Sequence, residues 1–304
     1  MNHDSHDRAL AAAQHLVDAI TNESSLAACR QMVDQIEVIR AQFDSSDIAF
    51  EHASALVSIS LIEDDPHACL GIANEIGAIR ATYDEEDLAL AHADSIFHAT
   101  IGQNDADACK QLADQIRAIR RLHDSDDIAV AHAKALFNTA AKHPTAASRR
   151  NCSDEIASIR SDRDSLALAT QHANMLELVS AVEPTAMARR KLAGEIAKIR
   201  LKQDSEEIAH THASVLFNVT SVEPDSKVCH QVVKEIQDIG KRWDTGDIAE
   251  TYAQAILNTA VGTKDSSARR LLADEIDAIR SRHDSEPLAL LQAQVLALLA
   301  CRAK

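Results

Sequence analysis

Five histidines recur at a constant interval of 40 residues: His52, His92, His132, His172 and His212. Imidazole is a common zinc ligand and titrates near neutral pH, so this column could bind a metal or sense pH. Neighbouring copies are expected about 8–10 Å apart, the packing distance of helices, whereas a zinc–nitrogen bond is about 2 Å long. The spacing therefore argues against a shared metal, and no metal site, cofactor or catalytic residue is predicted.

A hydrogen-bond ladder explains the histidine column better than a metal does. Each repeat carries an acid or amide about as far before the turn between two helices as the histidine lies after it. Buried polar groups are nearly always hydrogen-bonded, so the two columns are expected to face each other within one repeat. The expected pairs are Glu75 with His92, Glu155 with His172, and Glu195 with His212.

These columns belong to a 40-residue repeat without insertion or deletion. One isoleucine column is Ile36, Ile76, Ile116, Ile156, Ile196, Ile236 and Ile276. Two alanine columns, represented by Ala129 and Ala133, are four residues apart and so share one helix face, where a methyl group lets another helix approach closely. One helix pair cannot bury its apolar faces alone, whereas stacked copies can.

Each repeat is expected to fold as two antiparallel helices. The first helix follows a column of short capping residues: Ser25, Asp65, Asp105, Thr145, Thr185, Asp225 and Asp265. Their side chains accept hydrogen bonds from the free N–H groups of the first turn. The second helix is expected to start at the Asp44 column, where Asp44 and Asp47 resemble a capping box.

The predicted fold is an all-α, right-handed α-solenoid of helix-turn-helix repeats, with about 15 antiparallel helices in a single solenoid, 1–304. A capping helix is expected at 4–24. The two-helix repeats are 25–64, 65–104, 105–144, 145–184, 185–224, 225–264 and 265–304.

The composition favours a helical protein: 46% of residues are hydrophobic, and the chain has only 7 Gly and 5 Pro. The net charge of −16 disfavours binding to nucleic acid and to anionic membranes. No apolar run reaches the roughly 18 residues of a membrane span, and the N-terminal residues do not resemble a signal peptide. We expect a cytoplasmic protein that does not bind membranes.

The repeat resembles the tetratricopeptide-like (TPR-like) α-solenoids. It shares their helix–turn–helix unit, the small-residue columns in "DIAVAHAKALFNTA", and Pro144, Pro184 and Pro224 just before the next unit. The resemblance covers nearly the whole chain, although the unit has 40 residues and the family's about 34. HEAT-like repeats are the alternative. The resemblance implies a scaffold that binds other proteins along a concave groove, and it brings no catalytic residues.

Two further columns are assigned structural roles. An arginine column ends the first helices at Arg40, Arg80, Arg120, Arg160, Arg200 and Arg280. A cation there suits the helix dipole and has an aspartate four residues on. Gly240 is the one exception and is expected to loosen its turn. Cysteines of neighbouring repeats should lie too far apart for a disulfide, so reduced thiols are expected.

A basic cluster is the candidate partner-binding site. Several cations at the Arg30 position have an acid four residues on, but Arg190 faces Gly194 instead. The predicted site is Arg189, Arg190, Lys191, Lys198, Lys202 and Lys234. Such a patch on an acidic protein suits an acidic peptide or protein, and a solvated face without function is the alternative.

The C-terminal segment "LALLQAQVLALLACRAK" places leucines around most of a helix. Apolar patches on protein surfaces usually mark an interface, so Leu291, Val295 and Leu298 are predicted to mediate a homodimer. An array that continues beyond this helix is the alternative.

The leading hypothesis is a non-catalytic scaffold that binds a peptide or protein partner along the concave solenoid surface. Nearly every polar column has a structural explanation at the level of the repeat, and no nucleotide-binding or hydrolase motif occurs. A nucleic-acid-binding solenoid and a metal-dependent enzyme that uses the histidines are the alternatives.

Overall fold

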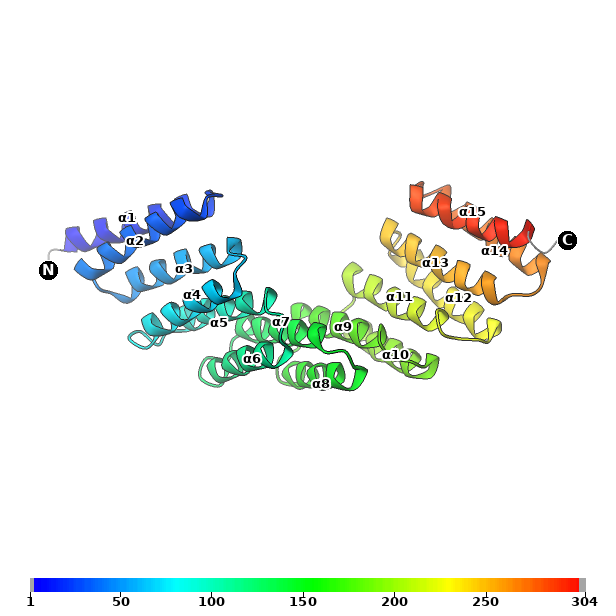
Figure 1. Ribbon diagram of the computed structural model, residues 1–304, viewed down its shortest axis with the longest axis horizontal. Coiled ribbons are helices and arrows are strands. Elements are labelled where there is room, and N and C mark those ends of the chain that lie inside the picture. Colours follow the sequence, from blue (N-terminus) through cyan, green and yellow to red (C-terminus); the bar gives the residue numbers. More distant parts are fainter. Residues whose placement is uncertain (1–2, 301–304) are drawn as a thin grey trace. The chain divides into compact units, whose positions relative to one another are not determined.

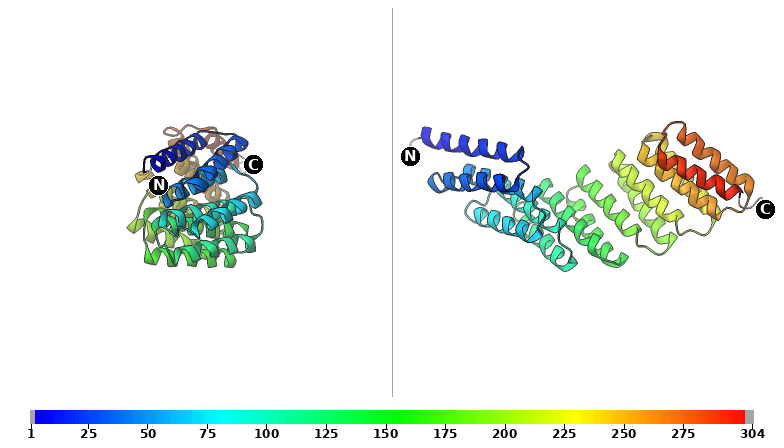
Figure 2. Two further views of the ribbon diagram at one scale, coloured as in Figure 1. Left: turned by 90° about the vertical axis from the view of Figure 1, so that its left-hand side faces the viewer. Right: turned by 45° about the horizontal axis from the view of Figure 1, so that its top comes forward.

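The computed structural model describes residues 3–300 of the chain. Within this range it holds fifteen α-helices and no strand, and the helices follow one another in the order of the chain (Figure 1, Figure 2). The predicted all-α repeat solenoid is therefore confirmed. The even-numbered helices are the first helices of the repeats, and the odd-numbered helices are the second.

The helices are α1 (His3–Thr21), α2 (Leu26–Gln42), α3 (Ser46–Ile62), α4 (Pro66–Arg80), α5 (Glu86–Ile101), α6 (Ala106–Arg120), α7 (Asp126–Lys142), α8 (Ala146–Asp162), α9 (Leu166–Ser180), α10 (Ala186–Lys202), α11 (Glu206–Thr220), α12 (Ser226–Arg242), α13 (Gly246–Gly262), α14 (Ser266–Arg280) and α15 (Glu286–Ala300). The described residues form two compact units, one of residues 3–143 with 161–168 and the other of 144–160 with 169–300.

The predicted caps of the first helices are confirmed at all seven positions. Ser25 accepts from the backbone N–H of Ala28, for example, and the other six cap residues accept in the same way from the first turns of their helices. The predicted start of the second helices is one residue too early. Ser45 caps α3 through a bond from the Ile48 N–H, while the Asp44 carboxylate binds Arg40.

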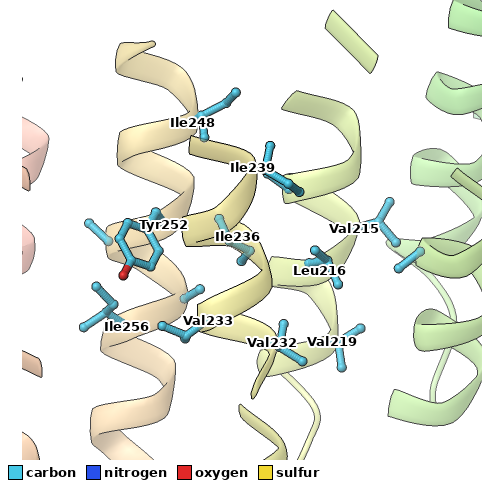
Figure 3. Packing of buried hydrophobic residues seen from close by; sticks show 14 of the residues in the cluster. Val215, Leu216, Val219, Val232, Val233, Ile236, Ile239, Ile248, Tyr252 and Ile256 are labelled. Carbon is cyan, nitrogen blue, oxygen red and sulfur yellow. The ribbon is translucent and has the colours of Figure 1, made fainter. Parts of the chain in front are cut away.

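Successive odd-numbered helices pack directly on one another from α1 to α7 and from α11 to α15. Alanine makes this close approach possible, and Ala133 and Ala213 are fully buried. Larger side chains fill the space between the helices of a hairpin. Figure 3 shows this core in the second unit, which includes Leu216 of α11, Ile236 of α12 and Ile256 of α13.

A polar ladder links consecutive odd-numbered helices. The Ser180 hydroxyl donates to the Glu177 carbonyl and accepts from the Asn218 amide at 2.9 Å. The same arrangement occurs at Thr220 and Asn258 (3.1 Å) and at Thr100 and Asn138 (2.7 Å). At the equivalent pair in the last repeat the hydroxyl becomes Ala260 and the amide becomes Leu298, which packs against the core. In these four pairs the two positions are therefore either both polar and hydrogen-bonded or both apolar.

This covariation predicts a coupled mutational effect. Ser180→Ala leaves the partly buried Asn218 amide without its acceptor, and we expect a loss of about 1–3 kcal/mol in the free energy of unfolding. Adding Asn218→Leu recreates the apolar pair of the last repeat and should recover most of that loss. Urea denaturation of the two single variants and the double variant measures the coupling. Effects that simply add would contradict the ladder.

Candidate binding site at a break in the repeat

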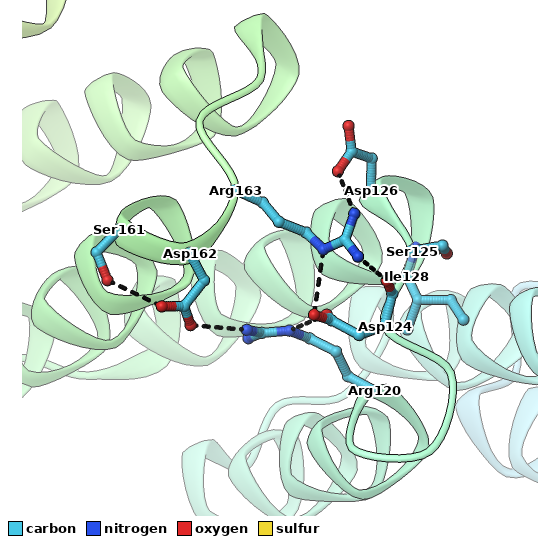
Figure 4. Close-up of polar contacts among 8 residues, drawn as sticks. All are labelled: Arg120, Asp124, Ser125, Asp126, Ile128, Ser161, Asp162 and Arg163. Carbon is cyan, nitrogen blue, oxygen red and sulfur yellow. Dashed lines mark hydrogen bonds and ion pairs between the residues drawn. The ribbon is translucent and has the colours of Figure 1, made fainter.

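Several aspartates of the Asp44 column, such as Asp124 and Asp204, bind side chains of two successive repeats. Asp124 accepts from the Arg120 Nε at 3.0 Å within its own repeat, and its other oxygen lies 3.1 Å from the Arg163 Nε of the next turn (Figure 4). Asp204 is surrounded in the same way by Arg200 at 2.7 Å and Arg242 at 2.9 Å. One carboxylate can therefore bind two guanidinium groups, one from its own repeat and one from the following repeat.

The arginines of this column also reach the histidine column. Arg200 Nη1 lies 3.2 Å from His212 Nδ1, and the equivalent distances are 3.3 Å at His52 and 3.2 Å at His172. Because a guanidinium group can only donate, each Nδ1 is the acceptor of a neutral ring. Burial, with help from the neighbouring arginine, lowers the pKa of His52 and His212 to about 4.

The predicted histidine–glutamate pairing is wrong for Glu75 with His92 and for Glu195 with His212. Glu195 instead accepts from Arg150 of the preceding repeat at 2.8 and 2.9 Å. Glu75 lies 3.6 Å from the Nε2 of His52, also in the preceding repeat. The acid column therefore faces backward to a neighbouring repeat rather than across its own hairpin.

Three members of the predicted basic site are not arranged as expected. Arg189 is only 8% exposed and donates to the carbonyls of Glu183 and Asn218, so it clamps the ends of helices. Arg190 has a partner after all, because it binds Glu235 of the next repeat. Lys234 is exposed on α12, a different helix from the rest of the cluster.

The remaining three lysines, Lys191, Lys198 and Lys202, follow one exposed face of α10. None of them has an acidic side chain within ion-pair distance among the described residues. Met187 and Leu201, which are 83% and 87% exposed, lie along the same helix. These five residues, called here the α10 face, combine unneutralised cations with exposed apolar side chains.

The predicted ion pairs four residues apart form at Lys110–Asp114 (2.6 Å) and Arg150–Asp154 (3.1 Å). Arg30 behaves differently, because it binds Glu63 at 2.8 Å rather than Asp34.

The last described helix, α15, carries the predicted self-association residues. Val295 is fully buried, and Leu291 and Leu298 are half-buried against the core. The large apolar side chains exposed on α15 are instead Leu290 and Leu296, at 59% and 45%. Val295 is therefore not accessible to a second molecule, whereas these two leucines are.

The cysteine column is buried, and the cysteines of residues 3–300 are free thiols. Burial raises the pKa of Cys69 and Cys109, which suits inert rather than reactive thiols. Cys301 lies outside the described residues. Within residues 3–300, no group of three or more His, Cys, Asp or Glu side chains could hold a metal ion, and no helix is long and apolar enough to cross a membrane.

One pocket lies where the repeat pattern breaks. Gly240 replaces the column arginine, and a cavity of about 130 Å³ opens beside it between α12, α13 and α14. Its walls include the chain's one tryptophan, Trp243, together with Asp244, Ile248 and Tyr252. Tyr252 stands in the histidine column and donates its hydroxyl to Glu275 of the next repeat. The pocket thus gathers the two residues that replace the column arginine and histidine, Gly240 and Tyr252, together with Trp243.

Sequence reasoning noted Gly240 only as a looser turn and missed this pocket. A signal was available, because the arginine and the histidine of one repeat are both replaced in the same unit, next to the only tryptophan. When two column residues of a regular repeat are replaced in the same unit, the side-chain packing of that unit is expected to differ locally.

Comparison with known proteins adds little to this description. No protein-family model matches the chain, and no curated protein matches it. One solved structure, described as "Computational Design of Self-Assembling Cyclic Protein Homooligomers", is 15% identical to this chain. The match covers 96% of this chain and 95% of the chain in that structure. Its TM-score is 0.18, so it carries no argument about this structure.

Proposed function

We propose that the protein is a non-catalytic, TPR-like scaffold of the cytoplasm that binds a peptide or protein partner with acidic and apolar side chains. The observation that supports this best is the α10 face, where three lysines without acidic partners stand beside two exposed apolar side chains. An acidic partner would neutralise the lysines, and burial of Met187 and Leu201 would add apolar contact. The buried free thiols of residues 3–300 suit a reducing compartment such as the cytoplasm.

The alternatives have less support. The imidazoles of His52, His172 and His212 are buried and accept from arginines, which leaves them poorly placed for metal chemistry. The three lysines of the α10 face lie on one helix, whereas a nucleic-acid groove would need cations along several repeats. Association through α15 stays a prediction, now for the surface that includes Leu290 and Leu296.

Charge reversal tests the proposed binding face. We expect Lys191→Glu with Lys198→Glu to weaken binding of a labelled peptide of alternating acidic and leucine residues at least tenfold, since each lost cation removes an attraction. Fluorescence anisotropy at low and high salt measures the affinity. Because the cations act by charge, the affinity of the wild type should fall with salt.

Lys227→Glu with Lys264→Glu is the matched control, because both lysines are exposed cations of the same unit and lie outside the α10 face. Equal weakening by the test and control pairs would show that only net charge matters. A wild type that binds a serine-substituted peptide as tightly as the acidic peptide would remove the proposed partner chemistry.

A further inference from the structure

We propose that the pocket beside Gly240 is a binding site for a guanidinium group, carried by an arginine side chain of a partner or by a small molecule. The site includes none of the lysines of the α10 face, so it can be tested independently of the proposed function.

The neighbouring repeat shows the occupied form of such a site. Asp204 binds two guanidinium groups at once, Arg200 from its own repeat and Arg242 from the repeat that follows. Asp124 does the same with Arg120 and Arg163 (Figure 4). At Asp244 the second of these partners is present, since Arg282 reaches Oδ1 at 3.0 Å. The first is absent, because the residue at the arginine position is Gly240.

The space left by that arginine stays open. The backbone of α12 runs through Gly240 as a regular helix, and a Cβ atom there would meet only Ile248 Cγ2, at an ordinary contact distance of 3.7 Å. The cavity of about 130 Å³ is close to the roughly 150 Å³ of engineered cavities that admit benzene, and a planar guanidinium head is of similar size. Neighbouring side chains have therefore not filled the space that an arginine side chain at position 240 would occupy.

The walls offer the acceptors that a guanidinium group needs. The two donors that Asp244 receives, Arg282 and His283, both reach its Oδ1, so Oδ2 has no donor among the described residues. The Tyr252 hydroxyl donates to Glu275 and keeps lone pairs for an incoming N–H. At Arg40, Arg200 and Arg280 the column arginine likewise bridges the aspartate and the residue in the histidine column, as Arg200 does with Asp204 and His212.

Two cationic side chains, Lys241 and Arg282, already line the pocket, and neither prevents a guanidinium group from binding. Lys241 is held by Asp238 at 2.7 Å, and Arg282 is the counterpart of Arg242, which shares Asp204 with a second arginine. The Trp243 ring already has the guanidinium of Arg242 5.6 Å from its centroid, which shows that it tolerates a cation at its face. A guanidinium group is planar and donates hydrogen bonds in two directions, so it fits this pocket better than the ammonium group of a lysine would.

The fluorescence of Trp243 provides a direct readout, because the chain has no other tryptophan. The probes are arginine amide and a short blocked peptide with one central arginine, compared with matched lysine and citrulline forms. Citrulline keeps the shape of arginine but has no charge. We expect saturable binding, confirmed by calorimetry, for the arginine probes, and at least tenfold weaker binding for the lysine and citrulline probes. Tighter binding of the peptide indicates a protein partner, and tighter binding of arginine amide indicates a small molecule.

Three variants test the location. Gly240→Arg restores the column arginine from within the chain and should abolish binding without lowering the melting temperature. Gly194→Arg adds the same charge at an exposed helical glycine with no atom within 4 Å of its Cβ, and should leave binding unchanged. Asp244→Asn should weaken binding at least tenfold, and this variant decides the case if Gly240→Arg fails to fold.

Three results would overturn the site. One is no saturation by either arginine probe up to about 10 mM. Another is equal binding of citrulline or of a neutral aromatic amide, which would make the pocket a general apolar cavity. The last is that the Gly240→Arg and Asp244→Asn variants both bind the arginine probes as tightly as the wild type does.

Discussion

The free energy of unfolding should fall by roughly 3–6 kcal/mol between pH 7 and pH 5, because buried neutral histidines resist protonation. The pKa values of His52, His92 and His212 are lowered to about 4, first by burial and then by a nearby arginine. The pKa of His98 is also lowered to about 4, first by burial and then by the charge of Lys134. In the unfolded chain the same rings titrate near 6.5. The unfolded state therefore binds more protons between these two values, so stability is complete above pH 6.5 and is lost as the pH falls toward 4.

Carboxylates change this profile in ways that can be separated. The pKa of Asp94 is raised to about 6 by burial, so its protonation favours the folded state and offsets part of the loss. Arginine neighbours hold the pKa of Asp124 and Asp204 below the usual value despite the opposing effect of burial. Their contribution to stability is present above about pH 3.8 and is lost only below it. The loss between pH 6.5 and 4 therefore belongs mainly to the histidines.

The chain supplies its own control substitution for this effect. Gln292 occupies the histidine column in the last repeat and accepts from Arg280, as His52 and His212 accept from Arg40 and Arg200. We expect His52→Gln with His212→Gln to keep the stability near that of the wild type at pH 7 and to reduce the acid loss by about half. Urea denaturation at pH 7, 6 and 5, followed by circular dichroism, measures both. A wild-type stability that is flat from pH 7 to pH 5 would contradict the neutral-ring assignment.

Local features of the fold could be predicted from the sequence because they depend on residues close together in the chain. The cap column is an example, since Thr185 needs only the N–H of Ala188 a few residues on. The ion pair of Arg200 with Asp204 within one turn is another. The alanine column was equally accessible, because its repetition alone indicates a close contact between helices.

Contacts between repeats could not be predicted, and the reason lies in the repeat itself. Glu195 and Glu235 occupy the same column, so the pattern cannot tell whether His212 faces the acid of its own repeat or that of the next. In the structure, the acid contacts a side chain of the preceding repeat, as in the pairs of His52 with Glu75 and Arg150 with Glu195. The pocket beside Gly240 was missed for a related reason, because it depends on what a missing side chain leaves between three helices.

Ala133→Leu should lower the free energy of unfolding by about 1–3 kcal/mol, because the larger side chain overpacks a contact that a methyl group fills. Ala133 is fully buried in α7, and α7 packs directly on α5. Ala293 occupies the same column in α15 but is exposed, so Ala293→Leu should change stability by less than about 0.5 kcal/mol. Urea denaturation of both variants gives the comparison. Equal effects at the two alanines would show that helix propensity, rather than close packing, governs this column.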